Sequence, residues 1–349
     1  MLYFHPRLLY NNYPITYIRN NNEQEMGEIM FELKKEKVEQ IYDLIIIGSG
    51  PAGMTAAVYA SRNGLKVAIL DMTPGGKLNE TSEIENWPGD TMIMGPELAQ
   101  RMAAHSTQFG AEFIFGQAEK VEDLGKYKQV ETFDKILQAK SILIATGTVE
   151  RKLGIPGEQE YYGNGVSYCA VCDAAFFKDE DVIVIGGGNS AYEAAEYLSR
   201  FAKNVYQVLR RDVIRASQIV VNRVEKRDNI KTMFSYSPIE IKGTNGKVSS
   251  VLFVNNKDKN ADPIEIKASA IFPAIGILPN TDFIKNLDIL DEDNYVIVDE
   301  KMRTPIKGIY AAGDVIAKKL RQIVTATNDG SIAGENIADY ILNDFDDEI

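Results

Sequence analysis

The chain has 349 residues, of which 45% are hydrophobic and 25% are charged, and its formal net charge is -12. Such a chain is expected to be a soluble globular protein of two domains, and its acidity argues against nucleic acid or an anionic membrane surface as the partner. No apolar run reaches the roughly 18 residues of a membrane span, and no secretory leader is recognisable, so we expect a cytoplasmic protein.

Residues 1–40 are rich in Asn and Tyr and end in the charged stretch ELKKEKVEQ. They show no lasting hydrophobic periodicity, so we expect a disordered or loosely attached extension. Met26 and Met30 leave a later start of the chain open.

From Tyr42 the pattern changes abruptly. YDLIIIG is a short apolar run typical of a buried parallel strand, GSGPAG follows as a glycine turn that opens a helix, and LKVAILD predicts a second strand. The same succession recurs from DVIVIGGGNSA to NVYQVLRRD. The chain therefore contains two nucleotide-binding units of the βαβ kind.

Each unit is followed by alternating apolar and polar residues with hairpin turns, over 112–144 and 232–272, and Asn245-Gly246 is a strong hairpin signal. The boundaries of the second unit are marked by Gly147, Gly154, Pro156 and Gly157 on one side and by Gly276 and Pro279 on the other, and these are hinge candidates. We predict an α/β fold with two Rossmann-like, three-layer ββα domains, each carrying an antiparallel β-meander.

Gly48, Gly50 and Gly53 fit the pattern G-x-G-x-x-G between the first strand and helix. Glycines there permit a tight turn and close approach of the backbone to a pyrophosphate at the helix N-terminus. Asp71 ends the second strand, where its carboxylate can accept hydrogen bonds from ribose hydroxyls and repels a 2′-phosphate. This turn therefore suits FAD or NAD; alternatively, Asp71 is only a turn residue before TPGG.

Gly186, Gly188 and Ala191 form the related pattern G-x-G-x-x-A. At the position that corresponds to the acid stand Arg210 and Arg211, with Arg215 shortly after, and arginines bind a 2′-phosphate by charge-assisted hydrogen bonds. We predict an NADPH site and a bound flavin in the first domain. The alternative interpretation of these arginines is a solvated basic turn.

Cys169 and Cys172, in SYCAVCDAAFF, are the only cysteines. A structural zinc needs four ligands, and only two histidines are present, so we expect no metal. Two inert thiols remain an alternative, but a redox pair beside a flavin and an NADPH site has a source of electrons. Asp173 is a candidate general acid; alternatively, it caps the segment DAAFFK.

With both glycine motifs, RRDVIRAS and CAVCD, the chain resembles the low-molecular-weight bacterial thioredoxin reductases. Further landmarks are ENWPGD, IATG, PAIGILPNT, AAGDV and LRQIVTATNDG. The resemblance extends from about Tyr42 to the C-terminal region, and only the N-terminal extension lies outside it.

The resemblance implies an FAD domain formed by 41–150 and 279–349, interrupted by an NADPH domain at 151–278 that carries the cysteines. It implies a homodimer in which NADPH reduces FAD, FAD reduces the disulfide, and the dithiol reduces thioredoxin. Cys172 is then nearer the flavin, Cys169 exchanges with thioredoxin, and Asp173 donates protons. Because one disulfide cannot reach both partners at once, the NADPH domain is expected to rotate between steps.

The resemblance also implies two sets of cofactor contacts. The FAD set is Gly48, Ser49, Gly50, Pro51, Ala52, Gly53, Asp71, Gly75, Gly76, Lys77, Leu78, Asn86, Gly313, Asp314, Arg321 and Gln322. The NADPH set is Gly186, Gly188, Asn189, Ser190, Ala191, Arg210, Arg211, Arg215, Ile275 and Gly276.

Three residues depart from the family pattern. Lys77 replaces a common Gln, Leu209 an often-found His, and Ala174 a usual Gly. Lys77 would add a cation near the flavin, Leu209 would weaken NADPH binding, and Ala174 would restrict the loop that carries the redox pair.

Four other functions differ from this one in the motifs that they require. A flavin dithiol oxidase needs no RRDVIR, a ferredoxin-dependent relative should lack GGGNSA and the arginines, and peroxiredoxin-reducing relatives carry an extra N-terminal dithiol domain. An NADPH-sensing binding protein with a vestigial cysteine pair would bind FAD without reducing disulfides.

Overall fold

The structure is a computed structural model that describes residues 35–81, 83–258 and 260–345. The chain forms two compact units. Unit 1 comprises the described parts of Met1–Pro74, Met102–Thr146 and Thr281–Ile349, and unit 2 comprises those of Gly75–Arg101 and Gly147–Asn280. The boundaries at 146/147 and 280/281 lie within four residues of the expected domain boundaries at 150/151 and 278/279. Residues 75–101, which were expected in the FAD domain, belong instead to unit 2.

A parallel sheet forms the centre of unit 1. Its strands, in the order β5-β2-β1-β8-β18, are β5 (Glu112–Phe115), β2 (Val67–Asp71), β1 (Glu36–Ile47), β8 (Lys135–Ile144) and β18 (Ile309–Ala311). Leu44 to Ile47 are almost completely buried, because they pair with Val67–Leu70 on one side and Ser141–Ile144 on the other. This is the environment that the continuous apolar run predicts.

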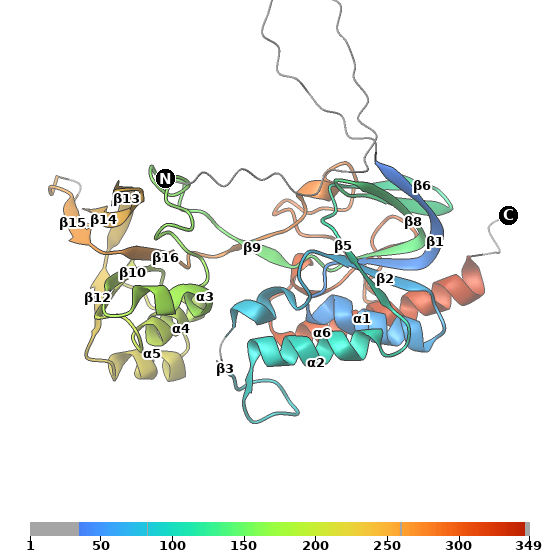
Figure 1. Cartoon of the computed structure of the whole chain (residues 1–349), viewed down its shortest axis with the longest axis horizontal. Coiled ribbons are helices and arrows are strands. Elements are labelled where there is room, and N and C mark those ends of the chain that lie inside the picture. The colour runs from blue at the N-terminus through green and yellow to red at the C-terminus, as the bar shows by residue number, and fades with distance from the viewer. Residues whose placement is uncertain (1–34, 82, 259, 346–349) are drawn as a thin grey trace, which may run out of the picture. The chain divides into compact units, whose positions relative to one another are not determined.

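Two helices of unit 1 run side by side beneath this sheet (Figure 1). They are α1 (Pro51–Arg62) and α6 (Ile323–Asp339). A Cβ added at Gly330 would stand 2.2 Å from the carbonyl oxygen of Ala52, so only glycine allows the helices to approach this closely. The amino end of α1 is thereby fixed at the sheet's carboxyl edge.

An antiparallel meander continues the sheet through β6 (Lys120–Leu124) and β7 (Tyr127–Glu131), which pairs with the first half of β8. The sequence predicted that the antiparallel meander begins at residue 112. The strand at 112–115, β5, instead pairs in parallel with β2 and belongs to the central sheet. Short helical turns complete unit 1: η3 (Asp282–Ile284), η4 (Gly313–Val315) and η5 (Tyr340–Asp344).

One expectation about the extension is wrong for its last residues. β1 begins at Glu36, so 36–40 belong to a strand that pairs with β8 rather than to a loose extension. The first residues of β1 are mostly exposed and therefore carry charged side chains, as in ELKKEKVEQ. Because they lack the apolar residues of a buried strand, the sequence did not predict a strand here. The remainder of the expected extension, 1–34, lies outside the described residues.

Unit 2 contains a second parallel sheet in the order β12-β11-β10-β16. Its strands are β12 (Ile230–Phe234), β11 (Asn204–Leu209), β10 (Asp181–Ile185) and β16 (Ala270–Pro273), and its helices are α4 (Asn189–Leu198) and α5 (Gln218–Glu225). An antiparallel sheet of β13 (Tyr236–Thr244), β14 (Lys247–Asn255) and β15 (Ile264–Lys267) follows. The hairpin at Asn245-Gly246 is confirmed, with φ angles of 55° and 77°. The predicted fold class is confirmed.

The remaining elements of unit 2 include the two connections between the units. β9 (Thr148–Glu150) and β17 (Ile277–Pro279) pair antiparallel, so the outgoing and returning chains form one ribbon. The segment 75–101 supplies η1 (Gly76–Glu80), β3 (Glu83–Ile84), β4 (Ile93–Met94) and the start of α2 (Gly95–Thr107).

Candidate active site

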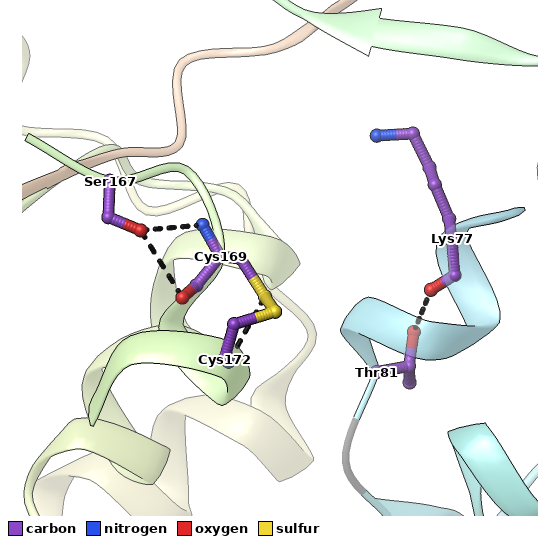
Figure 2. The surroundings of a disulfide bond; sticks show 5 residues. All are labelled: Lys77, Thr81, Ser167, Cys169 and Cys172. Carbon is purple, nitrogen blue, oxygen red and sulfur yellow. Dashed lines mark hydrogen bonds between the residues drawn. A yellow bond between two sulfur atoms is a disulfide. The ribbon is translucent and has the colours of Figure 1, made fainter. Parts of the chain in front are cut away.

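The two cysteines are joined as a disulfide at the start of the short helix α3 (Ala170–Asp173) (Figure 2). Cys169 is the N-cap residue, and its Sγ accepts a hydrogen bond from the backbone N–H of Cys172 at 3.1 Å. Cys169 is half-buried, whereas Cys172 is exposed. The predicted pairing of the only two cysteines is confirmed, and a disulfide provides no thiolates for a metal.

Buried polar residues hold the chain just before the disulfide. The Ser167 hydroxyl accepts the Cys169 N–H at 3.1 Å and lies 3.3 Å from the Cys169 carbonyl oxygen, to which it donates (Figure 2). The Tyr168 hydroxyl donates to the carboxylate of Glu158, which also accepts the N–H groups of Leu153 and Gly154, both at 2.7 Å. Burial is the largest cause that raises the pKa of Tyr168, so the phenol stays a donor.

Asp173 ends α3 and precedes the 3-10 turn η2 (Ala174–Phe177). Asp173 occupies the N-cap position of η2, as the alternative interpretation expected, but its side chain makes no cap hydrogen bond. Ala174 has a φ of -53° in the right-handed helical region and is fully buried, so replacing the usual glycine strains nothing. Phe176, 78% exposed, projects from the same turn.

The first glycine turn connects β1 to α1 and has room where a dinucleotide would lie. A Cβ at Gly48, with a φ of +102°, would stand 2.4 Å from the Ala145 oxygen, and one at Gly53 would stand 2.1 Å from the Gly48 oxygen. At Gly50 nothing lies within 4 Å. Gly48 and Gly53 thus serve packing, while Gly50 leaves open space in front of the α1 N-terminus, where Pro51 and Ala52 begin the helix.

Asp71 ends β2 and is bound by the glycine turn itself. Its Oδ2 accepts the Ser49 N–H at 2.6 Å and the Ser49 hydroxyl at 2.7 Å, and its Oδ1 accepts the Met72 N–H at 2.7 Å. Asp71 therefore has a turn-forming role as well as the position expected of a ribose acceptor. One carboxylate orders both loops that a dinucleotide would contact.

Two further residues of the FAD set in unit 1 hold buried polar atoms without a hydrogen bond to any described residue: Asp314 Oδ1 and Arg321 Nε. Burial is the largest cause that raises the pKa of Asp314, although Lys318 Nζ lies 3.6 Å from Oδ1. Gly313 precedes Asp314, and a Cβ there would stand 2.9 Å from that of Ala52, so η4 abuts the start of α1. Open space and orphaned polar atoms at this edge fit a bound dinucleotide.

The other members of the FAD set have local roles as well. Gln322 is the N-cap of α6 in a capping box with Thr325, and Leu78 is buried. Gly75 and Gly76 have positive φ and lead into η1. The Lys77 side chain forms an ion pair with Glu150. The backbone carbonyl of Lys77 accepts a hydrogen bond from the Thr81 hydroxyl at 2.9 Å (Figure 2). The extra cation at Lys77 therefore has a carboxylate partner. Asn86 is exposed.

The second glycine turn, between β10 and α4, repeats this arrangement. A Cβ at Gly186, with a φ of +148°, would stand 2.3 Å from the Ala274 oxygen, while nothing lies within 4 Å at Gly188. Ala191 is fully buried, and its methyl group occupies the space that Gly186 leaves free. Ser190 is exposed on the first turn of α4, and Asn189 Oδ1 accepts the Ser217 N–H at 2.7 Å.

The three arginines follow β11 directly, and all are exposed. None of their guanidinium groups forms an ion pair with a residue that the structure describes. Asp212, which stands among them, instead pairs with Lys257 and accepts the Ser235 hydroxyl, and the Lys257 bond is the largest cause that lowers the pKa of Asp212. Arg210, Arg211 and Arg215 are thus exposed and unpaired within the part of the chain that the structure describes.

Leu209, which replaces a common histidine, is buried with Tyr192 and Val221. It is a core residue, and Gly187 packs against it. Ile275 is half-buried against the antiparallel sheet, and the oxygen of Gly276 accepts the Arg151 N–H at 2.9 Å, which joins the two connections between the units.

The structure divides the sequence-predicted residues between the units. The cysteines, Asp173 and the whole NADPH set lie in unit 2, as do Gly75 to Leu78 and Asn86 of the FAD set, whereas the rest of the FAD set lies in unit 1. The sequence analysis did not identify the residues that hold the disulfide segment, which are Glu158, Ser167 and Tyr168. Nothing in a single sequence marks a glutamate ten residues from a tyrosine as its hydrogen-bond partner. Phe176 carried the one usable signal, a pair of phenylalanines beside CxxC.

Fold and site define a class of protein: one with two dinucleotide-binding units and a disulfide poised for electron transfer. A family model described as pyridine nucleotide-disulphide oxidoreductase matches residues 42–330. The chain belongs to this family.

Curated relatives cover nearly the same part of the chain. A thioredoxin reductase of Listeria innocua is 46% identical over 304 residues, which are 87% of this chain and 95% of the relative. One of Bacillus subtilis is 44% identical over 304 residues, 87% of this chain and 96% of the relative. The crystal structure of Lactococcus lactis thioredoxin reductase in the FR conformation matches with a TM-score of 0.83 at 46% identity, covering 86% of this chain and 99% of that one.

The described residues contain no helix that is both long and apolar enough to cross a membrane.

Proposed function

We propose that this chain is an NADPH-dependent thioredoxin reductase that works through the Cys169–Cys172 disulfide. The observation that carries the proposal is this disulfide, half-exposed on a short helix in the same unit as a glycine turn followed by three arginines that pair with no acid among the described residues. The relatives named thioredoxin reductase support it.

The two glycine turns divide the cofactors between them. We assign FAD to the first, where Asp71 excludes a 2′-phosphate and Gly50, Asp314 and Arg321 offer space and unsatisfied polar atoms. We assign NADPH to the second, with Arg210, Arg211 and Arg215 on its 2′-phosphate. When bound, the flavin passes two electrons from NADPH to a disulfide.

The reduced cysteines then carry out thiol–disulfide exchange. Cys169 Sγ, as a thiolate, attacks one sulfur of oxidised thioredoxin, so a mixed disulfide forms and the other thioredoxin sulfur leaves as a thiolate. Cys172 Sγ next attacks Cys169 Sγ, which reforms the Cys169–Cys172 disulfide and expels dithiol thioredoxin. The Cys172 N–H that points at Cys169 Sγ favours the thiolate at Cys169, and this supports its assignment as the attacking thiol.

Asp173 is assigned the proton transfers. It directly follows Cys172, and its carboxylate makes no cap hydrogen bond. It would donate a proton to the thiolate that forms and recover it from solvent, as a general acid does. Phe176, exposed four residues after Cys172, offers thioredoxin an apolar contact.

We further assign the protein to the cytoplasm, where a dithiol supplied by NADPH stays reduced, and to a homodimer. Size-exclusion chromatography with light scattering tests the dimer.

The deciding experiment compares NADPH and NADH as donors for DTNB and for thioredoxin, with the wild type, Cys169→Ser and Cys172→Ser. The wild type should reduce both disulfides with NADPH, and each serine variant should lose at least 100-fold of its turnover while keeping its flavin. Reduction of the flavin by NADPH, followed by absorbance, should survive in both variants.

Flavin binding without any disulfide reduction would contradict the proposal and favour an NADPH-binding sensor. Oxygen consumption with a dithiol donor, without need of NADPH, would favour a dithiol oxidase.

A further inference from the structure

Asp212 is the one acidic residue within the arginine segment 210–215, RRDVIR. It directly follows Arg211, just beyond the carboxyl end of β11, where the 2′-phosphate is assigned. A carboxylate at this place opposes such a site in two ways, because it repels the phosphate and competes with it for the guanidinium groups. Binding of a 2′-phosphate there requires that another group hold the charge of Asp212.

Two groups from outside the segment hold this carboxylate. The Lys257 ammonium forms an ion pair with Asp212 Oδ2, and the Ser235 hydroxyl donates to Asp212 Oδ1. The bond from Lys257 and then that from Ser235 lower the pKa of Asp212, so its carboxylate stays charged. Of the two groups only Lys257 carries a charge, and it alone neutralises the acid.

The backbone around this carboxylate is arranged to hold the pair. Ser235 joins β12 to β13, is buried, and has a φ of 64°, a left-handed conformation that residues with side chains rarely adopt. The Ser235 oxygen accepts the Asn256 N–H at 2.8 Å, and the Asn256 side chain donates to the Arg210 oxygen at 2.8 Å. The turn after β14 is thereby bonded to the segment at Arg210 and, through the next residue, Lys257, at Asp212.

The ion pair contributes little to stability. The side chains of Lys257 and Asp212 are 66% and 46% exposed, and ion pairs this exposed add little to the free energy of unfolding. The consequence of the pair lies in the charge of the segment instead. With the pair intact the segment presents three arginines, whereas without Lys257 it also presents an unpaired acid.

We propose that Lys257 determines the preference for NADPH over NADH, by neutralising Asp212 so that the three arginines of the segment meet the 2′-phosphate without a competing acid. This inference rests on the proposed function, since it takes the segment as the site of the 2′-phosphate. Lys257 lies in the turn between β14 and β15, outside the glycine motif and the arginine motif. Because it acts through Asp212, it is a positioning residue rather than a catalytic one.

The test titrates the full-length, flavin-loaded protein with 2′,5′-ADP and with 5′-AMP, which differ only in the 2′-phosphate, by isothermal titration calorimetry. Lys257→Met should weaken the binding of 2′,5′-ADP about 5-fold, because the phosphate loses a nearby cation and the released Asp212 competes with it. The affinity for 5′-AMP should stay at the wild-type value. Equal losses for both nucleotides would overturn the proposal.

Asp212→Asn in the Lys257→Met background is the rescue variant. Removing the acid should restore the wild-type affinity for 2′,5′-ADP, although neither charge of the pair is then present. Asp212→Asn alone should bind 2′,5′-ADP at least as tightly as the wild type. A double variant as weak as Lys257→Met would overturn the proposal. So would a loss of affinity in Asp212→Asn alone, because the carboxylate itself would then serve binding.

Lys242→Met is the matched control, because Lys242 forms an exposed ion pair with Glu265 in the antiparallel sheet of the same unit. It removes the same charge and should leave both affinities unchanged. A loss for 2′,5′-ADP equal to that of Lys257→Met would overturn the proposal and assign the effect to net charge.

The wild type separates this inference from the proposed function. A wild type that binds 2′,5′-ADP no more tightly than 5′-AMP would contradict the NADPH site itself, and the inference with it. A wild type that prefers 2′,5′-ADP, together with a Lys257→Met variant that keeps the full preference, would leave the NADPH site standing and overturn the role of Lys257 alone.

Discussion

At the scale of single residues, the arginines after β11 are predicted to decide which nucleotide the second glycine turn accepts. They are exposed, and Asp212, which stands among them in the sequence, is already paired with Lys257. The sequence predicted a 2′-phosphate clamp, and the structure adds the reason that the guanidinium groups stay available.

Arg210→Ala and Arg211→Ala should each raise KM for NADPH by about 10-fold to 100-fold, since a charged hydrogen bond contributes about 1.5–3 kcal/mol. KM for NADH should change less than 2-fold. Arg227→Ala is the control, because Arg227 pairs with Glu196 in the same unit. Equal losses for both nucleotides would contradict the clamp.

A second residue-scale prediction concerns Asp314, whose pKa is raised chiefly by burial. The folded flavin-free protein then binds the proton more tightly than the unfolded chain does. The free energy of unfolding therefore falls as pH rises from about 4, the ordinary Asp value, through the raised folded value.

Asp314→Asn should remove this pH-dependent loss of stability, so the flavin-free variant should be more stable than the wild type near pH 7, while its flavin affinity drops. Urea unfolding of the flavin-free protein between pH 4 and pH 8 measures the effect. Asp228→Asn, at an exposed position, is the control and should follow the wild type. A variant that keeps the wild-type slope would count against an Asp314 whose burial outweighs its pairing with Lys318.

At the scale of elements, the paired connections β9 and β17 are where the predicted rotation of unit 2 would take place. Gly147 and Gly276 flank this ribbon with φ angles of +62° and +123°, and a Cβ at either would meet nothing within 4 Å. Their glycines are thus needed for backbone conformation alone, as expected of hinge positions.

Gly147→Pro and Gly276→Pro should slow thioredoxin reduction at least 10-fold without loss of flavin, because proline fixes φ near -65°. Stopped-flow reduction of the flavin and steady-state turnover separate the steps. Gly125→Pro is the matched control, since this glycine has a φ of +81° and open space in the β6–β7 turn. If the control slows turnover equally, general strain rather than the hinge is responsible.

At the scale of the whole molecule, the predicted flavin should contribute strongly to stability, because it binds the folded chain and orders the glycine turn and η4 together. At a flavin concentration 1,000-fold above Kd, binding adds about 4 kcal/mol to the free energy of unfolding. That corresponds to a shift in Tm on the order of 10 °C for a domain of this size.

Removal of the flavin should therefore lower Tm by this amount, and added FAD should restore it. NADP+ added in place of FAD is the control for non-specific nucleotide binding. Identical melting curves with and without flavin would contradict the assignment of FAD to the first glycine turn.

The sequence by itself determined the features whose causes are local. The runs YDLIIIG and VAILD became buried strands because continuous apolar residues fit a parallel sheet covered on both faces, and Asn245-Gly246 became a hairpin because both residues tolerate positive φ. The glycine motifs, the arginines and the cysteine pair were readable for the same reason, since each depends on spacing along one short stretch.

The tertiary structure alone decided the partners. Only the fold joins Asp71 to Ser49, Glu158 to Tyr168 and Lys77 to Glu150, and only the fold turns β5 parallel to β2 and extends β1 back to Glu36. These contacts cross between segments that local propensity treats independently. Packing selects one pairing among many that the sequence permits, and that selection gave Asp71 a role in a turn and Lys77 a role in an ion pair, beside the cofactor roles predicted for them.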